Sequence, residues 1–237
     1  TAGIGVNFIE IYQRSGVYPV RHPFTPGSEA TGTVIAVGDG VEGFAVGDRI
    51  GTAAAVAAYA EQFVVAAEQA ARVPGAVDLE TAAALPLQGC TAHYLANSAA
   101  HPQPGDAVLV HAGAGGVGLL LTQLLTARGV RVLTTASSDA KRRISLEAGA
   151  AESFGYEGFA ERARELTGGE GVAVVYDGVG KDTFDDSLRA LRMRGEMVLF
   201  GGASGQGPLF DLQRLNSGGS LSITRPSVTH FMRTVEE

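Results

Sequence analysis

The sequence predicts an α/β protein of two parts, a β-rich domain followed by a domain with a doubly wound parallel sheet. From residue 1 to about residue 88, short β-type runs are broken by turn residues. From about residue 89 onward, continuous Val, Leu and Ile runs alternate with amphipathic segments, which is typical of a parallel sheet covered by helices on both faces. A cluster of glycines, HAGAGGVGLL, lies between one such run and the next amphipathic segment.

In the first part we expect strands within residues 31–38, 48–54 and 60–67. Gly-Asp pairs at 38–39 and 47–48 flank a short hydrophobic patch. Because Gly and Asp tolerate the backbone of tight turns, this spacing favours antiparallel strands.

The second part reads as strands and helices in alternation. A buried strand at 107–113 leads through the glycines to a helix at 116–129, which Gly129 ends. Ser138 or Asp139 can cap the second helix. The remaining expected elements are a strand at 130–137, a helix at 138–149, a short strand at 150–154, a helix at 157–169, a strand at 172–180 and, after the segment 181–195, a strand at 196–202.

Composition limits the possible functions. Of the 237 residues, 45% are hydrophobic and 18% are charged, as in a globular protein that can bury a sizeable core. No apolar run approaches the roughly 20 residues of a membrane span. A net charge of −7 argues against a nucleic-acid partner. Basic residues gather locally at 140–145 and 189–195, mostly as solvated helix faces, and any partner of these runs should be a small anion.

Cysteine usage points to a reducing compartment, the cytoplasm. Cys90 is the single cysteine, so an intrachain disulfide and a four-cysteine zinc site are both excluded. We expect Cys90 to be a small core residue. Since the chain starts without methionine and stops within an apparent helix, we expect it to be the ordered part of a longer protein.

The glycine cluster predicts a dinucleotide site. Gly113, Gly115 and Gly118 match G-x-G-x-x-G at a strand-to-helix turn, which is the context that this motif requires. We expect Gly113 to permit the tight turn, Gly115 to let a pyrophosphate approach the backbone, and Gly118 to let the helix pack on the strand. The helix N-terminus then attracts the anion.

The end of the second strand favours NADPH over NADH. An NAD site places Asp or Glu about 20 residues after the glycines. Here residues 135–138 are uncharged and Lys141 follows, a combination that suits a 2′-phosphate. We expect Asp139 to cap the helix. The alternative interpretation is that Lys141, Arg142 and Arg143 form a solvated helix face.

Several motifs resemble the quinone oxidoreductases, the zeta-crystallin-like branch of the medium-chain dehydrogenase/reductase superfamily. They are GVNFIEIYQRSGVYP, PFTPGSEATGTVIAVGDGV, GDRI, LPLQGCTAHYL, VLVHAGAGGVG, VVYDGVGKDTFDDSL and NSGGSLSITRPS. The resemblance implies a GroES-like catalytic domain over residues 1–88 that lacks its first strands. It also implies an NADPH-binding Rossmann domain over 89–229 and, over 230–237, the start of a segment that returns to the catalytic domain.

The resemblance also implies a set of cofactor contacts. It places Asn7, Thr91 and Asn216 near the nicotinamide and Gly115, Gly116 and Val117 at the pyrophosphate. The adenosine phosphate would contact Ser137, Lys141 and Tyr156, and the far side would be lined by Val179, Phe200, Gly201 and Ser204.

No zinc site is expected. Zinc-dependent relatives carry Cys, His and Cys ligands, whereas this chain has Asn7, Ser28 and Leu87 or a neighbour at those positions. The five histidines show no ligand spacing, and we expect His111 to be structural.

Without a metal to stabilise an alkoxide, a quinone or another conjugated carbonyl is the expected hydride acceptor. We expect Tyr12 and Tyr18 to form the pocket wall and to donate a proton, although both could be packing residues. Two alternatives stay open, an enoyl-thioester reductase and a non-enzymatic, crystallin-like NADPH-binding protein. The segments GEMVLFGG and LSITRPS resemble an edge that pairs between subunits, so we expect a homodimer.

Overall fold

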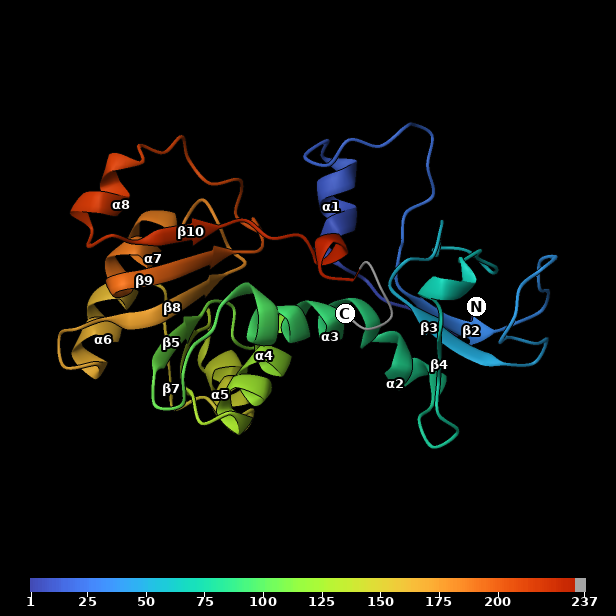
Figure 1. Ribbon diagram of the computed structural model, residues 1–237, viewed down its shortest axis with the longest axis horizontal. Helices are drawn as coiled ribbons and strands as arrows, with labels where there is room; N and C mark the ends of the chain where they lie inside the picture. Colours follow the sequence, from blue (N-terminus) through green and yellow to red (C-terminus); the bar gives the residue numbers. More distant parts are fainter. Residues whose placement is uncertain (233–237) are drawn as a thin grey trace. The chain divides into compact units, whose positions relative to one another are not determined.

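The chain divides into two compact units, Thr1–Cys90 and Thr91–Glu237. The computed structural model describes residues 1–232 (Figure 1), so residues 233–237 of the expected return segment lie outside the described part. The sequence predicts a domain boundary between residues 88 and 89, and the two units divide two residues later, within the helix α3 (Pro86–Tyr94).

The first unit contains a four-stranded antiparallel sheet in the order β1-β2-β3-β4. The expected strands at 31–38 and 48–54 are confirmed as the shorter β2 and β3, in register at Thr31 and Gly51. The elements of this unit are β1 (Gly3–Ile4), α1 (Phe8–Arg14), β2 (Ala30–Thr33), β3 (Arg49–Thr52), a 3₁₀ turn (Ala67–Gln69), β4 (Ala71–Arg72) and α2 (Leu79–Ala83).

The expected strand at 60–67 is wrong. That segment contributes only one isolated bridge, between Val64 and Val56. Both valines are exposed, Val64 by 76%, and within residues 1–232 that bridge is the strand pairing that this segment makes. Composition alone does not make a strand when a partner is missing.

The second unit is built on a six-stranded, wholly parallel sheet in the order β10-β9-β8-β5-β6-β7. Its elements are a π-helical turn (Leu95–Ala99), β5 (Ala107–Val110), α4 (Gly116–Ala127), β6 (Arg131–Thr135), α5 (Asp139–Glu147), β7 (Glu152–Phe154), α6 (Phe159–Leu166), β8 (Val172–Asp177), α7 (Phe184–Ala190), β9 (Leu191–Leu199), α8 (Gln213–Ser217), β10 (Ser222–Thr224) and a 3₁₀ turn (Val228–His230).

This strand order is that of the Rossmann fold, which confirms the predicted fold class. The chain leaves β5 toward β6 and later returns to β8 on the other side of β5, so the order reverses between β5 and β8. Ligands of such sheets bind beyond the carboxyl ends of the strands at this point.

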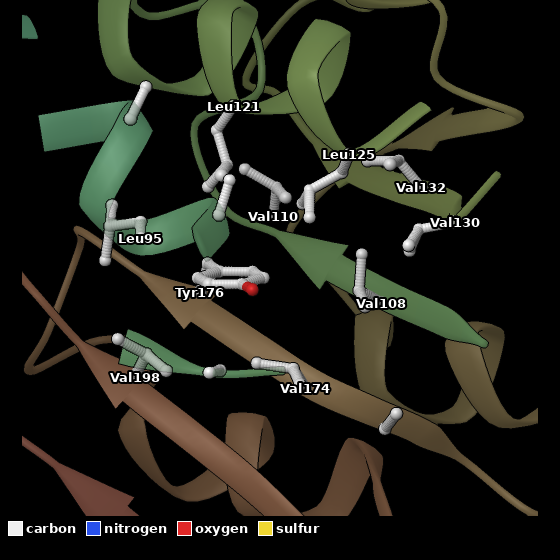
Figure 2. Close-up of a cluster of buried hydrophobic side chains, with 14 of the residues drawn as sticks. Leu95, Val108, Val110, Leu121, Leu125, Val130, Val132, Val174, Tyr176 and Val198 are labelled. Carbon is white, nitrogen blue, oxygen red and sulfur yellow. The ribbon is translucent and has the colours of Figure 1, made fainter. Parts of the chain in front are cut away.

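Both faces of the sheet are covered, as the continuous apolar runs predicted. Val108 and Val110 point to one face, where Tyr176, Leu121 and Leu125 pack against them (Figure 2). The intervening Leu109 belongs to the core of the other face, with other buried side chains such as Val175, Met197 and Phe159.

Two element boundaries in the second unit are informative. Gly129 has a positive φ of 77° directly after the capping residue of α4, as expected for a glycine that ends a helix. Strand β9 starts at Leu191, five residues before its expected start. Arg194, with a φ of +57°, and Gly195 allow an irregularity in this strand that keeps it paired with β8.

Among residues 1–232, no helix is long and apolar enough to cross a membrane.

Candidate functional site

The turn between β5 and α4 has the geometry of an anion-binding loop. Gly115 caps α4 with an extended backbone and without a side-chain hydrogen bond. The first N–H groups of a helix have no partner within the helix, so those of Gly116 and Val117 face the space ahead of α4. A Cβ added at Gly115 would contact only the carbonyl oxygen of Ala112, at 3.1 Å, which leaves room there for a ligand.

Gly118 and Gly113 are required by packing inside the protein. A Cβ on Gly118 would lie 2.4 Å from the Ala112 carbonyl oxygen, so α4 packs on the turn as predicted. A Cβ on Gly113 would lie 2.6 Å from both Thr134 Cβ and Ser145 Oγ. The expected reason for Gly113 is therefore corrected, because the left-handed residue of the turn is Ala112, with a φ of +52°.

The expected adenosine-phosphate residues follow the ends of β6 and β7. Ala136 N donates to Phe154 O at 2.9 Å, so the segments that carry Ser137 and Tyr156 leave the sheet side by side. The Tyr156 hydroxyl accepts a hydrogen bond from Ala112 N at 3.2 Å, which ties this aromatic ring to the glycine turn. Ser137 and Lys141 are exposed.

The acidic side chain that directly follows Ser138 forms an ion pair. Ser138, not Asp139, caps α5, by accepting from Lys141 N at 3.3 Å. Asp139 instead occupies the first turn of the helix and forms an ion pair with Arg142. Within the described part of the chain, the Lys141 ammonium has no ion-pair or hydrogen-bond partner, so it is available to an anion.

Four further expected cofactor residues lie together after β8 and β9. The N–H groups of Phe200 and Gly201 donate to Asp177 O at 2.9 and 3.2 Å, and Ser204 Oγ donates to Val179 O at 2.9 Å. A Cβ at Gly201 would lie 2.5 Å from Gly178 O, so this glycine is needed for the close approach of the two segments. The arrangement brings together, at the carboxyl ends of β8 and β9, the residues Val179, Phe200, Gly201 and Ser204.

Asn216 does not lie at these carboxyl ends. It lies on α8, is exposed, and its carbonyl oxygen accepts from Gly219 N at 3.1 Å just before β10 begins. Gly219 O in turn accepts from Arg194 N, in the first half of β9. Asn216 therefore lies near the amino-terminal end of β10, which α8 precedes (Figure 1), and its expected contact with the nicotinamide stays a prediction.

A buried polar network lies beneath the turn. Both ring nitrogens of His111 bond hydroxyls, Nδ1 with Thr135 Oγ1 at 2.8 Å and Nε2 with Ser187 Oγ at 2.9 Å. Ser187 donates to Asp177 Oδ2 at 2.9 Å, and the other oxygen, Oδ1, accepts from Gly180 N at 2.9 Å. Burial lowers the pKa of His111, an effect that Asp177 partly opposes, so the imidazole is neutral. His111 thus links the ends of β5, β6 and β8 and has a structural role.

In the first unit, Asn7 lies between two buried glutamates that the sequence did not single out. Asn7 N donates to Glu10 Oε2 at 2.8 Å, and Asn7 Nδ2 donates to Glu29 Oε2 at 2.6 Å. Glu29 Oε1 accepts from Leu87 N at 2.8 Å. Burial raises the pKa of Glu29, while the hydrogen bonds from Asn7 and Leu87 act in the opposite direction and the charge of Glu10 adds to the rise.

The remaining expected residues are placed as follows. Tyr12 and Tyr18 contact each other edge to face, with ring centroids 5.4 Å apart, and Tyr12 also contacts Phe8 at 6.1 Å. Thr91 is half-buried on α3. Cys90 is half-buried too, and burial together with the charge of Glu29 raises the pKa of its thiol.

A hollow of about 780 Å³ in the first unit is separate from all of these residues. It is lined mainly by apolar side chains, among them Ile35, Val41, Phe44 and Phe63, and by none of the expected site residues.

Both parts of the chain match known protein families. Residues 1–104 match the alcohol dehydrogenase GroES-like domain and residues 116–235 match the family described as zinc-binding dehydrogenase. The quinone oxidoreductase of Salmonella typhimurium is 45% identical over 99% of this chain and 73% of its own length. The chain belongs to the quinone oxidoreductases of the medium-chain dehydrogenase/reductase superfamily.

Solved structures of the family agree with the fold. A mycobacterial protein in complex with NADPH is 54% identical, with a TM-score of 0.95 over 98% of this chain and 74% of that one. The Escherichia coli quinone oxidoreductase in complex with NADPH is 42% identical, with a TM-score of 0.94 over 98% of this chain and 73% of that one. The resemblance expected from the sequence motifs is confirmed.

The residues at the superfamily's zinc position do not suit a zinc ion. The Asn7 amide is engaged by Glu29, and the Ser28 hydroxyl is a weak ligand compared with the imidazole or thiolate that zinc prefers. Across residues 1–232, no group of three or more His, Cys, Asp or Glu side chains is arranged to hold a metal.

Proposed function

We propose that this quinone oxidoreductase uses NADPH to reduce a quinone or a related conjugated carbonyl compound. The observation that carries the coenzyme preference is the end of β6, where uncharged Ser137 and unpaired Lys141 stand beside an aspartate already neutralised by Arg142. A 2′-phosphate would meet a cation there, and the nearby Asp139 carboxylate is already paired with Arg142.

The proposed NADPH site contains most of the cofactor-binding residues that the sequence predicts. Gly115, Gly116 and Val117 would bind the pyrophosphate through backbone N–H groups and the field of the α4 N-terminus. Ser137, Lys141 and Tyr156 would bind the adenosine phosphate. The far side would be lined by Val179, Phe200, Gly201 and Ser204, and Asn7 and Thr91 would contact the nicotinamide end. Asn216 is left out because of its position on α8.

In the proposed reaction the coenzyme supplies a hydride, and the protein supplies position and a proton. A quinone that accepts a hydride gains two electrons and one proton, and a second proton completes the hydroquinone. We propose that the Tyr12 and Tyr18 pair forms the wall of the acceptor site and that a tyrosine hydroxyl or water gives this proton. Holding the acceptor against the coenzyme is then the main contribution of the chain.

We further propose that the reaction is zinc-independent. Charge that develops on a quinone oxygen spreads through conjugation, so this acceptor needs no Lewis acid. The donor set at Asn7 and Ser28 supports the proposal.

Coenzyme titrations of a charge variant test the phosphate site. A hydrogen bond to a charged group contributes about 1.5–3 kcal/mol, so Lys141→Ala should raise the Kd for NADPH by about 10- to 100-fold. The Kd for NADH should change by less than about twofold, because NADH lacks the phosphate that Lys141 binds. Arg143→Ala removes a neighbouring exposed cation of the same helix and is the matched control.

An acceptor panel tests the reaction. We expect NADPH oxidation with 1,4-benzoquinone and 9,10-phenanthrenequinone to exceed that with trans-2-enoyl thioesters. The reverse order would identify an enoyl-thioester reductase, and no oxidation with any acceptor would identify a non-enzymatic NADPH-binding protein.

In the coenzyme titrations, an equal loss of affinity for NADPH and NADH in Lys141→Ala would show that this lysine does not bind the phosphate.

A further inference from the structure

Glu29 is the most tightly enclosed carboxylate of the first unit. Its side chain is fully buried, and each of its two oxygens accepts one hydrogen bond, from Asn7 Nδ2 at 2.6 Å and from Leu87 N at 2.8 Å. The bare backbone of Gly5 makes room for it, since a Cβ there would lie 1.8 Å from Glu29 Oε2. The carboxylate therefore has one position, fixed from three sides.

This arrangement decides which way the Asn7 amide points. An asparagine amide has a donor end and an acceptor end, which sterics alone hardly distinguish. Because Glu29 Oε2 accepts from Asn7 Nδ2, Oδ1 of the same amide faces the opposite side. A longer contact from Gln88 Nε2 to Asn7 Oδ1, at 3.4 Å, supports the same orientation. The Asn7 backbone is fixed independently by its bond to Glu10.

We propose that Glu29 is a positioning residue that fixes the orientation of the Asn7 amide for the nicotinamide carboxamide. This rests on the proposed NADPH site, in which Asn7 contacts that end of the coenzyme. The carboxamide also has one donor end and one acceptor end. A reversed Asn7 amide would oppose donor to donor and acceptor to acceptor, although its atoms would occupy the same volume.

Glu29→Gln reverses the amide with little change in volume. The backbone N–H of Leu87 still requires an acceptor, so the glutamine oxygen takes that side and its NH₂ group faces Asn7. Asn7 then turns its own oxygen toward residue 29. Glu10→Gln is the matched control, because Glu10 accepts from the Asn7 backbone and a glutamine oxygen can do the same.

The experiment uses calorimetric titration of the full chain with two ligands, NADPH and 2′-phospho-ADP-ribose, which lacks the nicotinamide. We expect Glu29→Gln to raise the Kd for NADPH by about 10-fold, which is the effect of one mispaired hydrogen-bonding group. The Kd for 2′-phospho-ADP-ribose should change by less than about twofold. Glu10→Gln should leave both unchanged. In an Asn7→Ala background, Glu29→Gln should have no further effect on NADPH, because it acts through Asn7.

Failure of this inference is distinct from failure of the proposed function. If the unsubstituted chain binds 2′-phospho-ADP-ribose and NADPH but Glu29→Gln changes neither or weakens both equally, Glu29 does not orient Asn7. A full 10-fold loss that persists in the Asn7→Ala background overturns the inference as well. If the unsubstituted chain binds neither ligand, the NADPH site itself is refuted.

Discussion

Two glycines of one turn are needed for different reasons. A Cβ on Gly118 would lie 2.4 Å from the Ala112 carbonyl oxygen and 2.9 Å from Gly113 Cα, whereas Gly115 opens to the space ahead of α4. Glycine is therefore needed for packing at position 118 and, in the proposed site, for the approach of the ligand at position 115.

Alanine substitutions separate these two reasons. Gly118→Ala forces backbone apart in a packed region and should lower the free energy of unfolding by about 1–3 kcal/mol. Gly115→Ala, whose Cβ would lie 3.1 Å from the Ala112 carbonyl oxygen, should lower the free energy of unfolding less than Gly118→Ala does. It should raise the Kd for NADPH by at least about 10-fold, because the new methyl group would lie where the pyrophosphate is proposed to bind. Urea denaturation and coenzyme titration of both variants measure the two effects. Unchanged NADPH affinity in Gly115→Ala would contradict the assignment of this residue.

At single residues, the sequence predicted only what local spacing encodes. Gly113, Gly115 and Gly118 follow the spacing of the dinucleotide-binding turn between a strand and a helix. Glu29 and Asp177 were missed because the fold, not the local sequence, determines their partners. Asn7 lies 22 residues from Glu29 along the chain. His111 is linked to Asp177 through Ser187, which lies 76 residues after His111. A signal for Glu29 was present in the sequence segment GSEATG, where a charged residue precedes an apolar strand.

Elements were predictable where burial on both faces leaves a continuous apolar run. This holds for β5, β6 and β8, whose side chains pack into cores on both sides of the sheet. It fails at 60–67 and at the start of β9, because a strand there depends on a partner or an irregularity that one sequence window does not contain.

The ends of β5, β6 and β8 are tied by His111, and this gives stability a specific pH dependence. Burial lowers the pKa of His111 below its ordinary value near 6.5, so the unfolded chain binds a proton that the folded chain refuses. Its contribution to the free energy of unfolding should therefore fall as pH drops below about 6.5, by at most about 1.4 kcal/mol per pH unit, and should be fully present at pH 7 and above.

Urea denaturation between pH 5 and pH 7.5 measures this dependence. His111→Gln should show a shallower slope than the unsubstituted chain, whatever its absolute stability, and the exposed His93→Gln should keep the original slope. Equal slopes for all three proteins would show that His111 is not held neutral.

At the scale of the whole molecule, strand β10 leaves one edge of the six-stranded sheet open in the part of the chain that the structure describes. An open edge is a template for pairing with another strand. This supports the proposed homodimer, in which the edges of two copies would pair.

A charge on this edge tests the assembly. Ser222 is exposed on β10, and Ser222→Lys should halve the mass observed by sedimentation at micromolar concentration, because an edge lysine opposes strand pairing. Ser217→Lys, on the exposed face of α8, should leave the mass unchanged. A monomeric unsubstituted chain, or a dimeric Ser222→Lys variant, would exclude this interface.

The buried polar network has the residue types of a hydrolase active site, in Asp177, Ser187 and His111, without its arrangement. They are the three residue types of a serine protease triad, and they are joined by short hydrogen bonds, yet the hydroxyl stands in the middle and the acid never touches the imidazole closely, at 4.0 Å. In a triad the histidine is central and the serine faces an acyl group. All three side chains are buried, so no acyl substrate can reach the Ser187 hydroxyl. A search by residue type alone, without the order of the hydrogen bonds, would mistake this reductase for an esterase.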